Sequence, residues 1–247
     1  MKSLMKMTWM EAKLFLRDPL SAFFTLIFPL IYLLMYGAIS GNEPSPMYGG
    51  QRTIDAAIPS LTAVIIAMTG LMATTMTMAT YREKGILRRL ATTPVSPLVV
   101  LTAQVIVVFL MTCLGMLLLI AAGKLLFDIH FEGNAFSLLG GFVLSSLSFF
   151  GIGFILAGIM PTVRTAWVVA MVLLYPMLFL SGAFFSVGLL PAAVQKISAF
   201  MPLTYVVNLL GGLWTGQPWS DHLLDVGVLA GMLVVGIIVS AKTFRWE

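Results

Sequence analysis

Six long tracts of apolar residues, separated by short polar segments, constrain this chain more than any other feature. They run from about residue 19 to 40, 56 to 80, 98 to 123, 136 to 160, 165 to 185 and 223 to 241. A helix needs about 20 apolar residues to cross the hydrocarbon core of a bilayer. Only 10% of the 247 residues are charged, whereas a soluble domain carries about 25%. The sequence therefore predicts an all-α integral membrane protein with six transmembrane helices.

The basic residues fall unevenly between the two sides that six spans define. With the N-terminus in the cytoplasm, eleven of the 14 Lys and Arg residues lie on the cytoplasmic side, and Arg52, Lys124 and Lys196 lie outside. Cytoplasmic loops of membrane proteins carry such an excess of Lys and Arg. We expect a multi-pass protein of the plasma (inner) membrane of a prokaryote, with both termini cytoplasmic. The net charge of +4 then reflects orientation, and no nucleic-acid partner is predicted.

Two segments outside the six tracts have their own patterns. In residues 1–18, basic residues recur at helical spacing between apolar ones, which favours a helix in the membrane interface over a signal peptide. A frayed basic tail is the alternative. Residues 186–216 are apolar but interrupted by Gly and Pro, and as a seventh span they would place Lys242 outside. We expect a re-entrant or interfacial pair of short helices on the outer side, sheltered by the other spans.

Motifs for covalent chemistry are missing. The sequence has no G-x-x-x-x-G-K-[ST] phosphate loop, and His130 and His222 stand alone in outer loops, without a metal-ligand cluster. The one cysteine, Cys113, allows no intrachain disulfide. No charge is expected inside the tracts, which argues against an ion-coupled carrier. We predict no catalytic residue, no metal site and no cofactor in this chain, which is expected to form a single transmembrane domain over residues 1–247.

The loop after the second tract carries the most informative pattern. Residues 82–91 can form a short amphipathic helix with Ile86, Leu87 and Leu90 on one side. Thr93-Pro94 then ends the helix, because the residue before a proline avoids the helical region. Such a helix could dock on a partner and pass motion into the spans. A solvated basic loop is an equally good interpretation of these residues alone.

Two motifs resemble those of the ABC type 2 permease family, which includes drug-resistance and polysaccharide or lipid-oligosaccharide exporters. Residues 83–90 (EKGILRRL) with 93–95 (TPV) are similar to the family's signature loop. Residues 180–185 (LSGAFF), 189–191 (LLP) and 201–204 (MPLT) are similar to its segment after the fifth span, a re-entrant helical hairpin. With the six-span layout, the resemblance covers nearly the whole chain. Ile86 departs from the family, where threonine is common at this position, and we expect docking to be unaffected.

The resemblance implies a permease subunit that exports an amphipathic drug, lipid or glycan-type substrate. It implies that a separate ABC ATPase subunit holds ATP and Mg, and that a second permease copy or a homologous permease completes the path in the lipid bilayer. Residues 82–91 would be the coupling helix that meets the ATPase, residues 161–165 a smaller contact, and residues 1–18 an elbow helix at the inner leaflet. The implied coupling residues are Arg82, Glu83, Lys84, Gly85, Leu87, Arg88, Arg89, Thr93, Pro94 and Arg164, and the implied elbow residues are Lys6, Glu11, Lys13 and Arg17.

Polar and flexible residues within two tracts are candidates for the wall of a substrate path. Methionine repacks around varied ligands, whereas threonine also favours helix packing in lipid, so both interpretations stay open. The candidate path residues are Thr69, Met72, Met76, Thr77, Met171, Tyr175 and Phe179. Packing between helices is predicted for Gly227 and Gly231, and interhelical hydrogen bonds for Gln104 and Asn208.

Two other functions remain open from the sequence. A secondary carrier or channel would transport without an ATPase, and carrier activity would collapse with an uncoupler. A non-transporting scaffold or sensor subunit would bind the ATPase without substrate flux.

Overall fold

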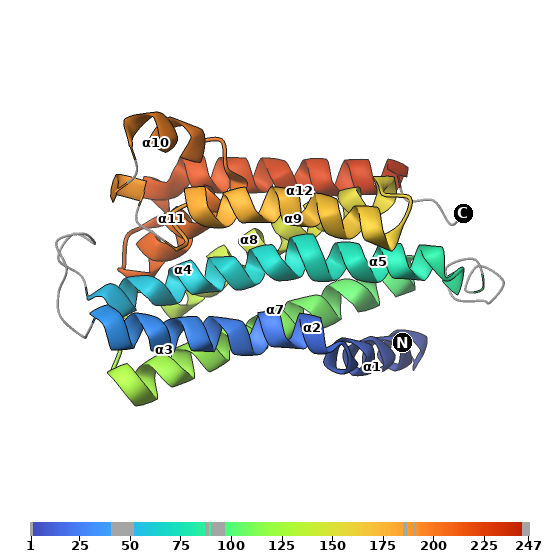
Figure 1. Cartoon of the computed structure of the whole chain (residues 1–247), viewed down its shortest axis with the longest axis horizontal. Coiled ribbons are helices and arrows are strands. Elements are labelled where there is room, and N and C mark those ends of the chain that lie inside the picture. The colour runs from blue at the N-terminus through green and yellow to red at the C-terminus, as the bar shows by residue number, and fades with distance from the viewer. Residues whose placement is uncertain are drawn as a thin grey trace.

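The computed structural model describes residues 2–40, 52–86, 89, 97–184, 187–189 and 191–243, and its regular elements are all helices. Six helical stretches are long and apolar enough to cross a membrane, which confirms the predicted six spans of a multi-pass membrane protein (Figure 1). The spans are Pro19–Ile39, Thr53–Glu83, Val99–Phe127, Ala135–Ile159, Val163–Leu180 and Trp219–Lys242.

The first two spans are each built from consecutive helical segments. The elements are α1 (Lys2–Arg17), α2 (Pro19–Ala22), η1 (Phe23–Ile27), α3 (Phe28–Ser40), α4 (Thr53–Ala67), η3 (Met68–Ala73), α5 (Thr74–Glu83), α7 (Pro97–Phe127), α8 (Ala135–Ile159), α9 (Val163–Leu180), η4 (Val187–Leu189), α10 (Ala192–Ser198), α11 (Pro202–Trp214), η5 (Trp219–His222) and α12 (Leu223–Thr243). Of these, η1 and η3 are π-helical turns, and they contact each other.

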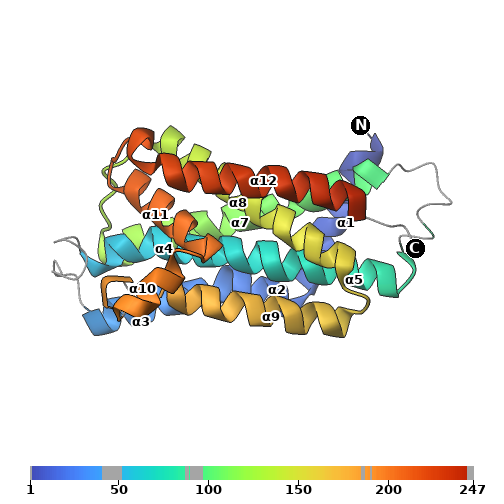
Figure 2. The ribbon, with the colours of Figure 1, turned by 90° about the horizontal axis from the view of Figure 1, so that it is seen from above.

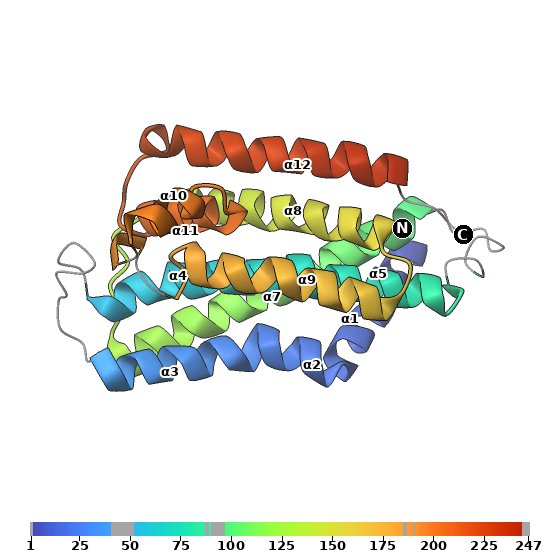
Figure 3. The same cartoon turned by 45° about the horizontal axis from the view of Figure 1, so that its top comes forward.

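The long helices lie side by side in one bundle with two distinct ends (Figures 1 and 3). We call the end that carries α1 the α1 end, and the opposite end, which carries α10, the α10 end. The last turns of α5, α8 and α12 lie at the α1 end, as Figure 2 also shows. The first described helix begins at Lys2 and the last ends at Thr243, and both of these points lie at the α1 end. Six spans require this, because every second span returns the chain to the side from which it started.

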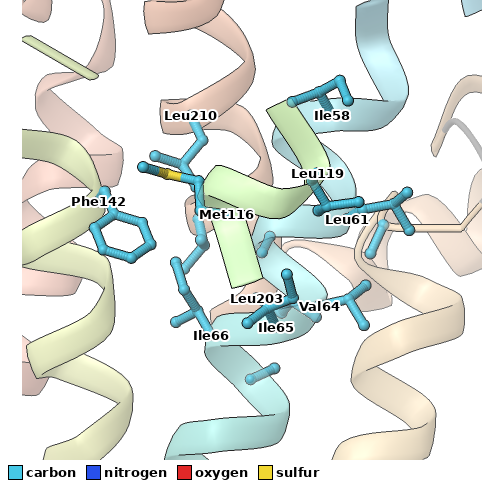
Figure 4. Close-up of a cluster of buried hydrophobic side chains, with 14 of the residues drawn as sticks. Ile58, Leu61, Val64, Ile65, Ile66, Met116, Leu119, Phe142, Leu203 and Leu210 are labelled. Carbon is cyan, nitrogen blue, oxygen red and sulfur yellow. The ribbon is translucent and has the colours of Figure 1, made fainter. Parts of the chain in front are cut away.

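The centre of the bundle is α4. Within the second span 83% of the most apolar stretch is buried inside the chain, compared with 17% for the first and last spans. Ile58, Leu61 and Ile65 belong to one buried cluster (Figure 4), and the same cluster contains Met116 and Leu119 of α7, Phe142 of α8, and Leu203 and Leu210 of α11. A helix that is apolar on every face can be covered by lipid or by other helices. The burial of the second span shows that other helices of the chain cover α4.

Close contacts between helices occur where both lack a side chain. A Cβ at Gly153 of α8 would lie 2.0 Å from the carbonyl oxygen of Gly70 in η3. Thr75 donates to the carbonyl oxygen of Gly153 at 3.1 Å, so this contact is also hydrogen-bonded. The prediction that Gly227 and Gly231 pack against a neighbouring helix is wrong within the described chain, because a Cβ at either meets no atom within 4 Å.

The expected pair of short helices before the last span is present. α10 and α11 meet at an angle of 89°, with Pro202 in the first turn of α11. Thr204 donates to the carbonyl oxygen of Ser198 at 2.8 Å, and the Tyr205 hydroxyl donates to that of Ala199 at 2.6 Å. These side chains satisfy carbonyls that the end of α10 leaves without helical partners.

Gly153→Ala is expected to destabilise the protein, because its methyl group would push α8 away from η3. Overpacking of this kind costs about 1–3 kcal/mol. Gly231→Ala is the matched control, since its methyl group has open space and alanine favours a helix. Thermal unfolding in detergent should show a lower Tm for Gly153→Ala alone. Equal Tm values for the two variants would contradict the close contact.

Candidate functional site

The last turn of α5 holds the end of α8. The Arg82 guanidinium donates to the carbonyl oxygens of Met160 at 2.8 Å and Gly158 at 3.2 Å, and it also contacts that of Ala157. The last carbonyls of a helix have no partner within the helix, and they carry a partial negative charge. Arg82 therefore satisfies and neutralises the C-terminus of α8.

The next residue holds the start of α9. A carboxylate oxygen of Glu83 accepts from the backbone N–H of Val163 at 2.7 Å, and an anion is favoured at a helix N-terminus. Thr162 and Thr165 form a capping box in the same turn. Arg82 and Glu83 thus bind the whole α8–α9 turn to α5. We call this arrangement, made of Arg82, Glu83 and residues 160–165, the loop platform.

The predicted helix over residues 82–91 is wrong in its boundary. Arg82 and Glu83 belong to α5, and Gly85 interrupts the helix with a φ of 64°, which glycine adopts readily. Ile86 and Arg89 are again helical, and the N–H of Arg89 donates to the carbonyl oxygen of Gly85 at 3.1 Å. The exposed side chains of Lys84 and Arg89 lie on this segment. Leu87, Arg88, Thr93 and Pro94 lie outside the described residues.

The α1 helix docks through one stripe of residues. Met7, Glu11 and Phe15 recur every four residues and are buried. Met7 and Phe15 pack against α7, and Glu11 accepts from the Tyr81 hydroxyl of α5 at 2.7 Å. Burial raises the pKa of the Glu11 carboxyl, and the hydrogen bond from Tyr81 lowers it in part. Glu11 is therefore an inward-facing contact, in contrast to the other implied elbow residues, Lys6, Lys13 and Arg17, which are exposed.

Two adjoining cavities flank α5. The first, of about 410 Å³, lies between α1, α5 and α7, and we call it the α1 cavity. The second, of about 230 Å³, lies between α2, the two π-helical turns, α5 and Trp167 of α9. Met76 and Thr80 line both cavities, so the two spaces meet along one face of α5.

The candidate path residues divide into three groups. Met72, Met76 and Thr77 line these cavities. Thr69 has no exposed surface and hydrogen-bonds to Thr112 at 3.0 Å, which is a packing role. Met171, Tyr175 and Phe179 follow Trp167 along one stripe of α9, on which Tyr175 and Phe179 are about half exposed, at 50% and 49%. Trp167 was missed, although it continues the same i, i+4 spacing.

A polar pocket of about 550 Å³ opens at the α10 end between α4, α11 and α12. His222 contacts Asp225 and Gln217, each at 2.9 Å, so it is not the isolated loop residue that was predicted. Asn208, predicted to form an interhelical hydrogen bond, lines the pocket instead. Asp225 is only 7% exposed within the last tract, so the expectation of charge-free tracts is wrong there. No group of three potential metal ligands converges among the described residues.

The fold and the loop platform define a multi-pass helical membrane domain with paired loops at one end. The chain belongs to the ABC-2 type transporter family, which it matches over residues 2–213. It is therefore the multi-pass permease domain of an ABC-2 type transporter.

Three curated relatives show what the chain is similar to. Nodulation protein J of Rhizobium leguminosarum bv. viciae is 35% identical over 102 residues, which is 41% of this chain and 39% of that protein. Two probable multidrug ABC transporter permeases of Escherichia coli K12 also match. YbhS is 27% identical over 191 residues (76% of this chain, 48% of that protein), and YbhR is 22% identical over 169 (68% and 45%). The matches span less than half the length of each relative.

Arg82→Ala is expected to lower the free energy of unfolding by about 1–3 kcal/mol, because it removes hydrogen bonds from a charged donor to the end of α8. Arg164→Ala is the matched control. It also removes an arginine side chain, but from the exposed surface of the adjacent turn, and it should change the free energy of unfolding by less than about 0.5 kcal/mol. Denaturant unfolding of the two variants in one detergent measures the difference. A fully stable Arg82→Ala variant would show that the loop platform does not depend on this contact.

Glu11 should make stability depend on pH. The unfolded chain releases this proton near the ordinary pKa of 4.5, whereas the folded chain holds it to higher pH. Stability is therefore expected to fall as the pH rises from 4.5 through the raised pKa of the folded state. Glu11→Gln keeps an acceptor for Tyr81 and does not titrate, so its Tm should exceed that of the wild type at pH 7. Melting curves from pH 5 to pH 8 test this, and a pH dependence unchanged by Glu11→Gln would refute it.

Proposed function

We propose that this chain is the permease subunit of an ATP-driven exporter, with the α1 end in the cytoplasm and the loop platform facing the ATPase. The observation that carries the proposal is the joining of residues 82–83 and 160–165 into one unit by Arg82 and Glu83. Eleven of 14 basic residues fall on the cytoplasmic side in this orientation. Residues 1–247 then act as one permease domain in a prokaryotic plasma membrane.

Motion would enter the membrane through α5. When ATP binding closes the ATPase dimer, a push on the segment around Lys84 and Gly85 reaches α5 directly. It reaches α8 and α9 through Arg82 and Glu83, so three helices move together. Because α5 continues through η3 into the buried α4, the same push is transmitted to the centre of the bundle.

Substrate would enter beside α5 from the cytoplasm or the inner leaflet. Met72 and Met76 give the second cavity a flexible apolar wall, which suits varied amphipathic molecules such as drugs or lipids. Two similar proteins are named probable multidrug permeases, which supports this substrate class, and a glycan-type substrate remains compatible with the similarity to Nodulation protein J. Release would follow at the α10 end.

A second permease would complete the path. The α9 stripe that contains Tyr175 and Phe179 is exposed in the single chain, and large apolar side chains of this kind need lipid or protein to cover them. We propose that a second copy or a homologous permease covers part of this stripe, beside the cavity that Trp167 lines. The elbow role of α1 fits the same layout, because Met5 (75% exposed) and Trp9 (65% exposed) accompany its exposed basic residues.

A secondary carrier is the second candidate, and the His222–Asp225 pair favours it. An ionisable pair buried at the start of a span is the type of site that proton-coupled carriers use. Reconstituted permease without any ATPase would then transport under a proton gradient and stop with an uncoupler. A scaffold or sensor would bind the ATPase and show no substrate flux.

Co-purification with a soluble ABC ATPase is the first expected result. Glu83→Ala should lower transport and substrate-stimulated ATP hydrolysis, because it releases α9 from the loop platform. Gly85→Ala should also lower transport and ATP hydrolysis. The added Cβ meets no atom within 4 Å, so the effect would come from the backbone, because alanine is strained at a φ of 64°. Gly227→Ala is the control, on a helix surface with open space. Transport by the purified permease alone, driven by a proton gradient, would overturn the exporter proposal.

A further inference from the structure

Gln104 of α7 has an unmet hydrogen-bonding requirement. Its side chain is 3% exposed and lines the α1 cavity, and its carbonyl oxygen has no partner among the described residues. A buried polar atom without a partner is unfavourable, because it has lost the hydrogen bonds that water would give it. The predicted interhelical hydrogen bond of this oxygen is therefore absent within the described part of the chain, and a donor from a bound ligand fits the site.

The same cavity presents further oxygen acceptors and hydroxyl groups. Glu11 lies in its wall with one carboxylate oxygen bound to the Tyr81 hydroxyl, and Thr77 and Thr80 face it from α5. The interior is thus suited to a small polar group that donates hydrogen bonds. A volume of about 410 Å³ accommodates a headgroup of a few heavy atoms together with water.

The rim of the cavity, in contrast to its interior, carries basic side chains and therefore favours an anion. Arg17 at the end of α1 and Lys84 after α5 are exposed and belong to the lining. Asp18, also in the lining, is occupied by hydrogen bonds from Leu20 and Ser21. Two basic side chains therefore remain to contact a phosphate. Leu14, 46% exposed on the same rim, offers an apolar surface for acyl chains.

We propose that the α1 cavity binds a phospholipid whose phosphodiester contacts Arg17 and Lys84 and whose headgroup donates a hydrogen bond to Gln104. The donor is a hydroxyl in phosphatidylglycerol and an ammonium in phosphatidylethanolamine, while phosphatidylcholine has neither. In the orientation proposed above this lipid comes from the inner leaflet. The site is a property of the permease alone, whether or not the lipid is itself transported.

The test is lipid binding to the purified full chain in detergent, without an ATPase. Phosphatidylglycerol, phosphatidylethanolamine and phosphatidylcholine with identical acyl chains are titrated and followed by native mass spectrometry and thermal shift. At least one of the first two should bind more tightly than phosphatidylcholine, and their order identifies a hydroxyl or an ammonium donor. Because no ATPase is present, failure here would leave the exporter proposal intact.

Gln104→Leu should abolish the preference for a donor headgroup, weakening the preferred lipid about tenfold and leaving phosphatidylcholine unchanged. Ser145→Ala is the matched control, because Ser145 is also buried with an unpartnered oxygen but lies in α8 outside this cavity. Gln104→Met, a nearly isosteric change, serves if the leucine variant does not fold.

Arg17→Gln should weaken all three lipids by up to about fivefold, since they share the phosphodiester. Lys13→Gln, on the same helix but outside the lining, should not weaken any of them. Equal affinity for the three headgroups in the wild type, or a headgroup preference that survives in both Gln104 variants, would overturn the proposal and leave water as the partner of Gln104.

Discussion

The burial of α4 is the constraint on which the rest of the structure depends. Because α3, α7, α8 and α11 surround it, this helix cannot shift unless its neighbours repack. Its continuation, α5, leaves the core at the α1 end and carries the polar contacts of Arg82 and Glu83. The most deeply buried span of the bundle is therefore also the one that carries the residues of the loop platform at its end.

Bending within this helix has a defined place. η3 replaces one turn of the second span with a π-helical turn, and the hydroxyl of Thr74, the first residue of α5, donates to the carbonyl oxygen of Thr69 in that turn at 3.0 Å. π-helical turns recur at functional sites and are a recognised cause of helix kinks. η1 contacts η3 and lines the same cavity, so the two weak points of the first two spans meet at the proposed path.

The spans, α1 and the bent pair could be predicted because length, composition and periodicity are local properties. The partners of Arg82, Glu83 and Glu11 lie 70 to 80 residues away in the sequence, so no pattern in the chain shows them. The boundary at residue 82 failed for the same reason, since the amphipathic pattern is compatible with α5 and with a separate helix. His222 and Asp225 are three residues apart, a spacing that brings side chains together on a helix, so their contact was predictable. It was missed because the last tract was predicted to begin at about residue 223, which leaves His222 in the preceding loop.

The position of the charges bears on the source of energy. In the six described spans every charged residue lies within about two turns of a helix end, including Asp225 at one end of the bundle and Arg82 at the other. A secondary transporter holds its coupling ion near the bilayer midplane, where access can alternate between the two sides. The His222–Asp225 pair instead lines a pocket that opens at the α10 end, far along the bundle from Glu11. Because no Asp, Glu, Lys, Arg or His lies at the centres of the described spans to connect these sites, a push on the loop platform explains directed transport more simply than proton coupling.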